Sequence, residues 1–407
     1  MPQGLNILFV HQNMPGQFKH LAPKFAANPK NKVAFITKRE GVDIPGVRRV
    51  NYQIPRTAKE TTHHYVRLFE NSVIYGQQTV RACHDLHKDG FRPDVIVAHP
   101  GWGEALFLKD VYPKTPLLNF CEFYYSGRGA DIGFDPEEET GLDDILRARA
   151  RNAHLLLSLE SCDAGFSPTE WQRRSHPAVF QTKISTIFDG IDTDYMKPDP
   201  AASFSMPDGR VLNRGDEVIT YSVRNLEPYR GFPNFIRALP RLLELRPNAQ
   251  VLVVGGHEVS YGRSAPNGKS WREHMLEEVP LDPARVHFLG KLPYARYREV
   301  LQISSAHIYL TRPFVLSWSC IEAMSVGCLV VGSATPPVQE VIEDGVNGFL
   351  VDFHSPDAIA RKTAEAVAAG ASLDAMRQRA RETVLDRYAL SKCLPRQIKL
   401  VKDLAGR

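Results

Sequence analysis

Short apolar runs alternate with longer amphipathic stretches along the whole chain, and this alternation constrains the fold more than any other feature. In the first half the apolar runs are residues 6–12, 32–37, 94–99 and 116–120, and the longest amphipathic stretch is residues 59–88. In the second half the apolar runs are residues 217–223, 249–256, 286–290, 306–311 and 328–333. Strands that alternate with helices form parallel sheets with helices on both faces. Two such series predict an α/β protein with two Rossmann-like, doubly wound domains.

The two series are separated by residues 194–217, which are rich in Pro, Asp, Ser and Gly and show no periodicity. We therefore expect an N-terminal domain over residues 1–195, a linker over 196–216 and a C-terminal domain over 217–385. Residues 386–407 are predicted to form a helix that packs back on the N-terminal domain. Ligands of open parallel sheets bind beyond the carboxyl ends of the strands. Two such domains facing each other would place a ligand in the cleft between them.

Composition excludes several classes of protein. The chain has 407 residues, which suits two domains, and its net charge of +4 comes without the long Lys/Arg run of a nucleic-acid-binding protein. No apolar run reaches the roughly 18 residues of a membrane span, and the first apolar run lacks the basic flank of a signal peptide. The six cysteines are scattered without a Cys-x-x-Cys pair, which predicts reduced thiols in a cytoplasmic protein.

Three loops of the first half carry candidate site residues after expected strands. Gly16 lies in a Pro-Gly turn after the first strand and could let the backbone approach a ligand closely; a simple tight turn is the alternative. His99 ends the strand of residues 94–99, where an imidazole could bind a sugar hydroxyl or assist proton transfer, or serve the structure alone. Glu122 follows the next strand beside two tyrosines, a combination typical of carbohydrate sites, although a solvated loop would read the same way.

The second half offers cations and one carboxylate. Arg224 and Arg230 stand six residues apart across a turn after a strand, so both could face a phosphate. Gly231 would begin the next helix, whose N-terminal amides add to an anion site. Glu322 is expected in the first turn of its helix, either because the helix dipole favours a negative charge there or because its carboxylate accepts both hydroxyls of a ribose. The loop before it, residues 314–319, would offer backbone amides.

Metal ligands are not expected. The Asp-x-Asp of residues 192–194 lies in the interdomain segment and is more typical of a turn, and the paired histidines lack a convincing ligand set. No dinucleotide or Walker fingerprint follows the first strand. We therefore predict neither a metal nor another cofactor.

Four stretches of the sequence resemble family 4 of the retaining glycosyltransferases, which have the two-Rossmann GT-B fold. They are "VRNLEPYRG" (223–231), "VHFLGKLPYARYREVL" (286–301), "IEAMSVGCLVVGS" with "VQEVIEDGVNGFLV" (321–333 and 338–351), and "ISTIFDGIDTDYMKP" (184–198). The resemblance implies that Arg224 and Arg230 bind the donor diphosphate, with Arg230 in place of the family's Lys. It also implies that Glu322 binds the donor ribose and that Lys291 and Leu292 lie in the loop that cups the nucleobase. The first half matches through residues 11–22, which include Gly16, and through His99.

The sequence departs from the family pattern at two places. The first glutamate of the family's pair, which touches the donor sugar or supports the reacting face, falls on Phe314, and the Gly-Phe-Gly after it is replaced by Val315, Leu316 and Ser317. The resemblance still places Phe314, Leu316 and Ser317 in the donor site. The family's histidine after the strand of residues 116–120 falls on Glu122, which we expect to take over sugar or acceptor contacts.

The resemblance implies a retaining, metal-independent transferase that moves a sugar from a nucleoside-diphosphate sugar to a hydroxyl of a glycan, lipid-linked or small-molecule acceptor. His99, Glu122, Arg224 and Arg230 would form its catalytic group, and polysaccharide biosynthesis is the typical setting. Two alternatives on the same fold are a sugar-nucleotide epimerase and a non-catalytic sugar-nucleotide or glycan-binding protein. A dehydrogenase is disfavoured because the dinucleotide fingerprint is absent.

Three arginines, Arg147, Arg149 and Arg151, fall on one expected helix. Such a face would suit docking at the inner face of the cell membrane, where a lipid-linked acceptor could lie, and a solvated helix face is the alternative.

Overall fold

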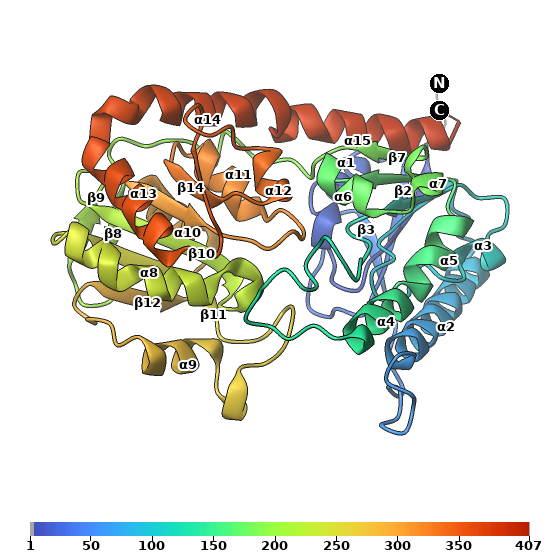
Figure 1. The fold of residues 1–407 in the computed structure, drawn as a ribbon. Helices are drawn as coiled ribbons and strands as arrows, with labels where there is room; N and C mark the ends of the chain where they lie inside the picture. The colour runs from blue at the N-terminus through green and yellow to red at the C-terminus, as the bar shows by residue number, and fades with distance from the viewer. Residues whose placement is uncertain (1–3, 407) are drawn as a thin grey trace. The chain divides into compact units, whose positions relative to one another are not determined.

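A computed structural model describes residues 4–406, which fold into two compact units (Figure 1). Unit 1 comprises residues 4–189 together with 391–406, and unit 2 comprises residues 190–390. Each unit contains its own parallel sheet flanked by helices, which confirms the predicted class of two Rossmann-like α/β domains. All six cysteines of the sequence are buried, and none of them takes part in a disulfide.

Unit 1 is built on a sheet in which all neighbouring strands run parallel. Among the described residues the strand order is β3-β2-β1-β4-β5-β6-β7. The strands are β1 (Asn6–Val10), β2 (Lys32–Thr37), β3 (Val47–Asn51), β4 (Val95–Ala98), β5 (Leu117–Phe120), β6 (Ala164–Ser167) and β7 (Ile184–Thr186). The four strands expected in this half are present. Three further strands were not predicted from the sequence: β3, whose residues are half-exposed, and the short strands β6 and β7.

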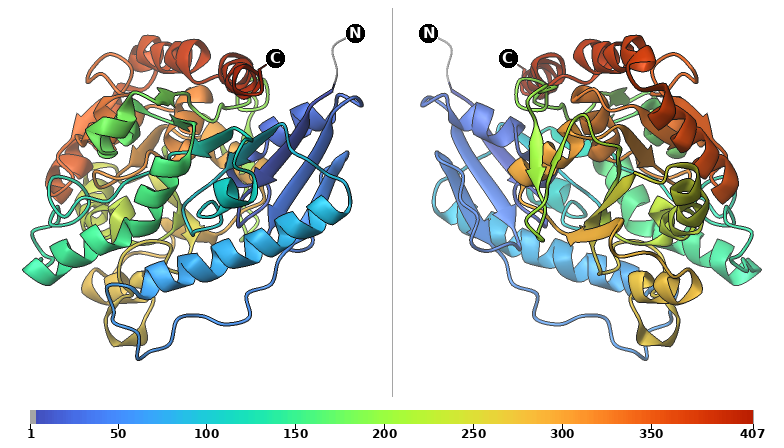
Figure 2. Two further views of the ribbon diagram at one scale, coloured as in Figure 1. Left: turned by 90° about the vertical axis from the view of Figure 1, so that its right-hand side faces the viewer. Right: turned by 90° about the vertical axis from the view of Figure 1, so that its left-hand side faces the viewer.

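Helices cover both faces of this sheet, and Figure 2 shows α2 lying along it. They are η1 (Gly16–Phe18), α1 (Leu21–Ala26), α2 (Arg67–Lys88), α3 (Leu108–Val111), α4 (Leu142–Arg151), α5 (Ala153–Ser161), α6 (Glu170–Ser175), α7 (Ala178–Gln181) and α15 (Leu390–Leu404). Alternate residues of β1 enter two cores: Ile7 and Phe9 pack with α1 and α15, whereas Leu8 and Val10 pack with α2 and α3. The helix expected from residue 59 begins only at Arg67, because Glu70 binds back to Arg56 and Thr62 and fixes the preceding segment as a loop.

Unit 2 repeats this architecture with the strand order β12-β11-β10-β13-β14-β15 among the described residues. Its strands are β10 (Val218–Asn225), β11 (Gln250–Gly256), β12 (Val286–Gly290), β13 (Ala306–Tyr309), β14 (Val330–Ser333) and β15 (Phe349–Val351). Its helices are η2 (Pro228–Arg230), α8 (Phe232–Leu245), η3 (Pro266–Gly268), α9 (Trp271–Glu278), α10 (Tyr294–Gln302), α11 (Trp318–Ser325), α12 (Pro336–Gln339), α13 (Pro356–Ala369), η4 (Gly370–Leu373) and α14 (Asp374–Arg387). Helix α8 packs against α13, and α11 packs against α14.

The segment expected to be a linker is a structured part of unit 2. Residues 196–216 contain the antiparallel hairpin of β8 (Ser203–Ser205) and β9 (Val211–Asn213). Phe204 is buried beneath the guanidinium of Arg296, and the buried Met196 accepts hydrogen bonds through its carbonyl from Ser325 and Arg381. Buried apolar side chains at alternate positions therefore fold a segment whose Pro- and Asp-rich composition predicts an interdomain linker.

Both sheets place their first strand beside their fourth, β1 beside β4 and β10 beside β13. Connections leave the two strands in opposite directions at this point, which is the position where open α/β sheets bind their ligands. The residues that directly follow these strands are therefore the first candidates for a binding site in each unit.

Candidate functional site

In unit 1 the strands β1, β4 and β5 are neighbours, and each is followed by a polar side chain. Val10 pairs with Ala98 and Ala98 with Asn119, so the ends of the three strands are level. His11 follows β1, His99 follows β4, and Glu122 comes two residues after β5. The sheet thus brings together two side chains that the sequence predicted, His99 and Glu122, and one that it did not predict, His11.

Hydrogen bonds join these side chains through Gln17. His11 Nε2 lies 2.7 Å from Gln17 Oε1, and Gln17 Nε2 donates to Glu122 Oε1 over 2.9 Å. His99 Nε2 lies 3.5 Å from Glu122 Oε2, which is ion-pair distance. Trp102 stacks on the ring of His99, with ring centroids 4.9 Å apart. Sequence reasoning missed Gln17 and Trp102, although both stand in loops that it singled out.

Backbone amides fix which nitrogen of each imidazole carries the proton. His11 Nδ1 accepts from the amide of Asn13 over 2.8 Å, and His99 Nδ1 accepts from the amide of Gly101 over 3.0 Å. In the neutral rings the proton is therefore on Nε2, which points toward Gln17 in one case and toward Glu122 in the other. The Nε2–H of His99 thus faces Glu122 directly, and that of His11 faces Glu122 through Gln17.

The charges of this group follow from its surroundings. Burial alone would raise the pKa of Glu122, but its interactions with His99, His11 and Gln17 outweigh burial and lower the pKa. Burial, helped by the neighbouring His99, lowers the pKa of His11 to about 3. At neutral pH the group consists of an ionised carboxylate beside a neutral His11. Because 36% of the Glu122 side chain remains exposed, the carboxylate can accept a hydrogen bond from a hydroxyl of a bound molecule.

Gly16 belongs to this region for a packing reason. Its φ is +51°, in the left-handed region, and a Cβ at this position would lie 2.3 Å from Nε2 of His11. The glycine thus leaves room for the imidazole of His11. Its predicted part in donor binding stays a prediction.

In unit 2 the side chain of Arg230 lies beyond the carboxyl ends of β10 and β13. Arg230 ends η2, which follows β10, and its Nη1 donates to Thr311 Oγ1 over 2.8 Å and to the carbonyl of Val315 over 2.9 Å. Both acceptors lie in the segment after β13. Arg230 is 6% exposed, and within residues 4–406 these two hydrogen bonds leave Nη2 and Nε as free donors. A buried guanidinium with spare donors at the switch point is suited to an anionic ligand.

The turn after Arg230 depends on Gly231, which caps α8 with φ +67°. A Cβ here would meet Cβ of Leu310 at 2.5 Å, so only glycine fits the turn. The first amides of α8 thus begin directly after Arg230, as predicted. Arg224 is the next-to-last residue of strand β10 and is exposed, so the two arginines differ strongly in burial.

Glu227 is a buried acid in the same turn that sequence reasoning overlooked. Its Oε2 accepts from the amides of Ser260 and Tyr261, at 3.1 and 2.8 Å. These bonds hold the segment after β11 against the turn, and Tyr261 then lies 5.8 Å from the guanidinium carbon of Arg230. Burial raises the pKa of Glu227, against the opposing effect of those amides and of the two nearby arginines. The sequence signal that could have revealed this buried acid is the position of Glu227 between Leu226 and Pro228, directly after a strand.

Glu322 is buried, but its place in the helix differs from the prediction. Helix α11 begins at Trp318, so Glu322 lies in the second turn, and the first turn carries no acid. The dipole argument for this residue is therefore wrong. Its Oε1 accepts from the hydroxyl of Tyr294 over 2.7 Å, and its Oε2 accepts from the hydroxyl of Tyr297 over 3.0 Å. Two tyrosines of α10 thus hold the carboxylate, which is 5% exposed.

The apolar loop before α11 is packed inside unit 2. Phe314 is 3% exposed and its ring lies between Tyr229 and Tyr261, with centroids 5.3 and 5.0 Å away. Leu316 is buried as well, at 6%. The side chain at the family's first glutamate position therefore fills an aromatic cluster, which explains why the loop is apolar.

Ser317 caps α11 through its side chain, which accepts from the amide of Ser319. Its own amide donates to the hydroxyl of Tyr309 over 2.8 Å. The prediction that this loop offers backbone amides to a ligand is thus wrong for Ser317, because an internal acceptor takes its N–H. The roles of Phe314, Leu316 and Ser317 toward a donor stay predictions.

The loop after β12 holds the two residues predicted near a nucleobase. Lys291 Nζ lies 2.7 Å from Glu258 Oε2, and both side chains are more than half exposed. Such a pair contributes little to stability and can open for a ligand. Leu292 next to it is half-buried.

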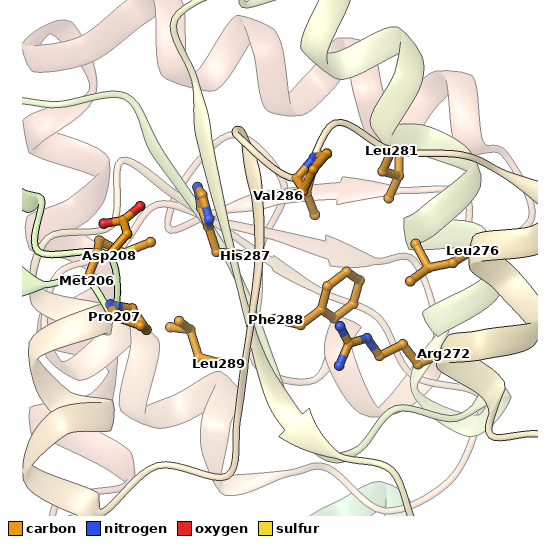
Figure 3. Close-up of a pocket in the computed structure, with 11 residues that line it drawn as sticks. Met206, Pro207, Asp208, Arg272, Leu276, Leu281, Val286, His287, Phe288 and Leu289 are labelled. Atoms are coloured by element: carbon orange, nitrogen blue, oxygen red, sulfur yellow. The ribbon is translucent and has the colours of Figure 1, made fainter.

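A pocket of about 330 Å³ lies along the edge strand β12, between the β8–β9 hairpin and α9 (Figure 3). Figure 3 shows Phe288 next to Arg272 on one side and His287 near Asp208 on the other. None of the predicted site residues lines it. Within residues 4–406, no group of three or more His, Cys, Asp or Glu side chains is arranged to hold a metal ion.

Family models match both halves of the chain. The model described as "Glycosyl transferase family 4 group" matches residues 29–196, and the model described as "Glycosyl transferases group 1" matches residues 208–383. The chain belongs to the family 4, group 1 glycosyltransferases. The resemblance inferred from the sequence motifs is thereby confirmed.

The curated relatives align with only about half of the chain. A GDP-mannose-dependent alpha-(1-6)-phosphatidylinositol monomannoside mannosyltransferase of Mycolicibacterium smegmatis is 26% identical over 235 residues, covering 54% of this chain and 55% of that protein. A D-inositol 3-phosphate glycosyltransferase of Streptomyces griseus is 28% identical over 193 residues, covering 44% and 40%. The chain thus spans about half the length of the curated relatives it matches.

Solved structures resemble the whole chain. Sucrose-phosphate synthase of Thermosynechococcus elongatus has a TM-score of 0.72 at 16% identity, covering 99% of both chains. The HepE protein of Anabaena in complex with UDP-glucose has a TM-score of 0.67 at 16% identity, covering 98% of this chain and all of that one. At this identity the likeness shows the fold. Of the helices in residues 4–406, none is long and apolar enough to cross a membrane.

Proposed function

We propose that the protein is a retaining, metal-independent glycosyltransferase that moves a sugar from a nucleoside-diphosphate sugar to a hydroxyl of a glycan, lipid-linked or small-molecule acceptor. One observation carries the proposal: Arg230 is buried at the switch point of the unit 2 sheet, beside the start of α8, with donors to spare. Buried, preorganised donors of this kind stabilise the charge that develops on a departing diphosphate.

Unit 2 would hold the donor. Arg230 and the exposed Arg224 would bind the diphosphate, Glu322 the ribose, and the loop at Lys291 and Leu292 the base. The solved HepE complex with UDP-glucose supports a nucleotide sugar as donor, because that protein shares the fold. In the reaction the bond between the sugar C1 and the phosphate oxygen breaks, and a bond from C1 to the acceptor oxygen forms. The protein must therefore balance negative charge on the diphosphate and release the acceptor's hydroxyl proton.

Unit 1 would bind the acceptor or the reacting sugar through His99 and Glu122. The ionised carboxylate can accept a hydroxyl proton in a hydrogen bond, and Trp102 next to His99 offers a ring face for sugar C–H groups. The names of the relatives, which act on a phosphatidylinositol mannoside or on inositol 3-phosphate, support an acceptor rich in hydroxyls.

We infer that the protein is a cytoplasmic enzyme of polysaccharide biosynthesis and that it docks at the membrane. Helix α4 exposes Leu142 and Leu146, at 69% and 42%, one turn apart and close in sequence to Arg149. Apolar and basic side chains on one helix favour binding to anionic lipid. Sedimentation with vesicles of phosphatidylglycerol and phosphatidylcholine tests this point. Equal recovery of wild-type protein and of the variant Leu142→Gln with Leu146→Gln would contradict it.

The test of the proposed function is nucleoside-diphosphate release from a panel of nucleotide sugars, with and without inositol phosphates and glycans as acceptors. Acceptor-dependent release supports transfer, and NMR of the product's anomeric proton decides retention. Arg230→Ala should lower turnover about tenfold or more. Arg237→Ala, which removes an ion pair with Glu278 on the outside of α8, should leave it unchanged.

Four other outcomes would contradict parts of the proposal. Epimerised sugar without acceptor would indicate an epimerase, and donor binding without turnover would indicate a binding protein. Loss of activity in EDTA, restored by a divalent cation, would contradict metal independence. Unchanged activity of Arg230→Ala would refute its place in diphosphate binding.

A further inference from the structure

The carboxylate of Glu322 already receives two hydroxyl groups from within unit 2. The hydroxyls of Tyr294 and Tyr297 each donate to a different oxygen of the carboxylate, at 2.7 and 3.0 Å. A vicinal diol binds a carboxylate in the same way, with one hydroxyl on each oxygen. The two phenols thus reproduce the pattern of donors that a ribose would present.

The two tyrosines differ in how firmly they are held. Tyr297 is 9% exposed and lies within α10, so its hydroxyl is a fixed part of the site. Tyr294 is the first residue of α10 and is 47% exposed. Its ring stacks on Tyr195, with centroids 5.4 Å apart and planes 12° apart, and its remaining surface can reach water. Of the two hydroxyls, only that of Tyr294 can leave the carboxylate at little cost.

A buried carboxylate needs its donors before a ligand arrives. Leaving a buried acceptor without a partner costs free energy, so an internal hydroxyl that meets this need stabilises the empty site. A ligand hydroxyl that binds the same carboxylate oxygen must then displace this internal hydroxyl.

We propose that Tyr294 is a placeholder for a ribose hydroxyl and thereby a determinant of donor affinity. The inference rests on the proposed function of unit 2 as the nucleotide site. The donor's ribose displaces the Tyr294 hydroxyl from Oε1 of Glu322, while Tyr297 stays and keeps the carboxylate oriented. The net gain from ribose binding is then an exchange of one hydrogen bond for another. A ligand whose ribose lacks both hydroxyls cannot make this exchange and leaves Tyr294 in place.

The experiment is isothermal titration of uridine, guanosine and adenosine diphosphates into wild-type protein, Tyr294→Phe, Tyr297→Phe and Tyr195→Phe. Tyr294→Phe should bind the preferred nucleotide about three- to tenfold more tightly, because the empty variant lacks the competing hydrogen bond. Tyr297→Phe should bind it more weakly. Tyr195→Phe keeps the stacked ring but removes a hydroxyl that is not bonded to Glu322, so its affinity should not change.

The 2′,3′-dideoxy form of the same nucleotide is the decisive control, since it cannot use the vacated oxygen. Tyr294→Phe should bind this analogue no more tightly than wild type does. Weaker or unchanged binding of the intact nucleotide to Tyr294→Phe would overturn the placeholder role while leaving the nucleotide site standing. If no nucleoside diphosphate binds to any of the four proteins, the proposed function of unit 2 fails and the inference fails with it. Circular dichroism spectra of the four proteins should be the same, which checks that the substitutions leave the fold unchanged.

Discussion

Replacing Phe314 with glutamate would give the chain the carboxylate that its relatives' pattern has, and the structure predicts that unit 2 loses stability. The ring of Phe314 is 3% exposed and contacts the rings of Tyr229 and Tyr261. The residue therefore acts as part of a packed cluster. An introduced carboxyl would lose this packing and would be enclosed among aromatic rings.

The magnitude follows from two opposing effects. Removing a buried phenylalanine ring typically costs about 3–5 kcal/mol, which includes aromatic pairs worth about 0.5–1.5 kcal/mol each. Two cations partly offset the burial of a new charge, since Arg230 lies 5.8 Å from the ring of Tyr261 and Arg312 lies 5.1 Å from that of Tyr229. We expect Phe314→Glu to lower the free energy of unfolding of unit 2 by about 3 kcal/mol, and Phe314→Leu by about 1–2 kcal/mol.

Hydrogen exchange in increasing urea, followed by mass spectrometry of peptides from β10 and β13, measures the stability of unit 2 separately from unit 1. The substitution Phe288→Glu serves as the matched control, because Phe288 is half-buried on the edge strand β12 against Arg272. It should lower the free energy of unfolding by less than about 2 kcal/mol. A loss below about 1 kcal/mol for Phe314→Glu would refute the packing role assigned to Phe314. The loop would then be free to accept a carboxylate facing a ligand.

Two further predictions concern the backbone of unit 2 and the buried histidines. Gly231→Ala should destabilise unit 2 by about 2–4 kcal/mol, because φ is +67° and the new Cβ would meet Leu310. Gly345→Ala, with φ +73° and open space around it, should cost only about 1–2 kcal/mol in the same urea assay, and equal losses would contradict the steric argument. Burial lowers the imidazole pKa values below the usual 6.5, to about 3 for His11 and His307 and about 4 for His154 and His176. Between pH 6.5 and these values the unfolded chain binds more protons, so stability should fall on acidification by up to about 1.4 kcal/mol per pH unit for each imidazole. Urea midpoints that stay constant from pH 7 to 5 would contradict this.

Much of the fold could be read from the sequence because buried parallel strands are continuous apolar runs. Nine expected runs coincide with β1, β2, β4, β5 and β10–β14. The strands that were missed are short or half-exposed, such as β3, whose sequence Val-Arg-Arg-Val-Asn contains no apolar run and no fully buried residue. The hairpin of residues 203–213 was missed because its few buried side chains stand among turn-forming residues, whose composition predicts a linker.

The candidate site divides in the same way. Residue type and position after a strand pointed to His99, Glu122 and Arg230. The sheets place His99 and Arg230 at the switch points, and Glu122 lies beside His99. His11 and Gln17 carry no local pattern of their own. They enter the group only because β1 lies beside β4 and because Gly16 leaves room for an imidazole.

The sequence by itself determined the two doubly wound units, the family, and which charged residues follow the central strands, because periodicity and motifs are local properties of a chain. Only the tertiary structure decided what those residues contact. It placed Phe314 inside a cluster with rings from two other segments, and it paired Glu322 with hydroxyls from α10. Whether a side chain faces a ligand or a core depends on which distant segments pack against it, and spacing along one segment carries no information about those partners.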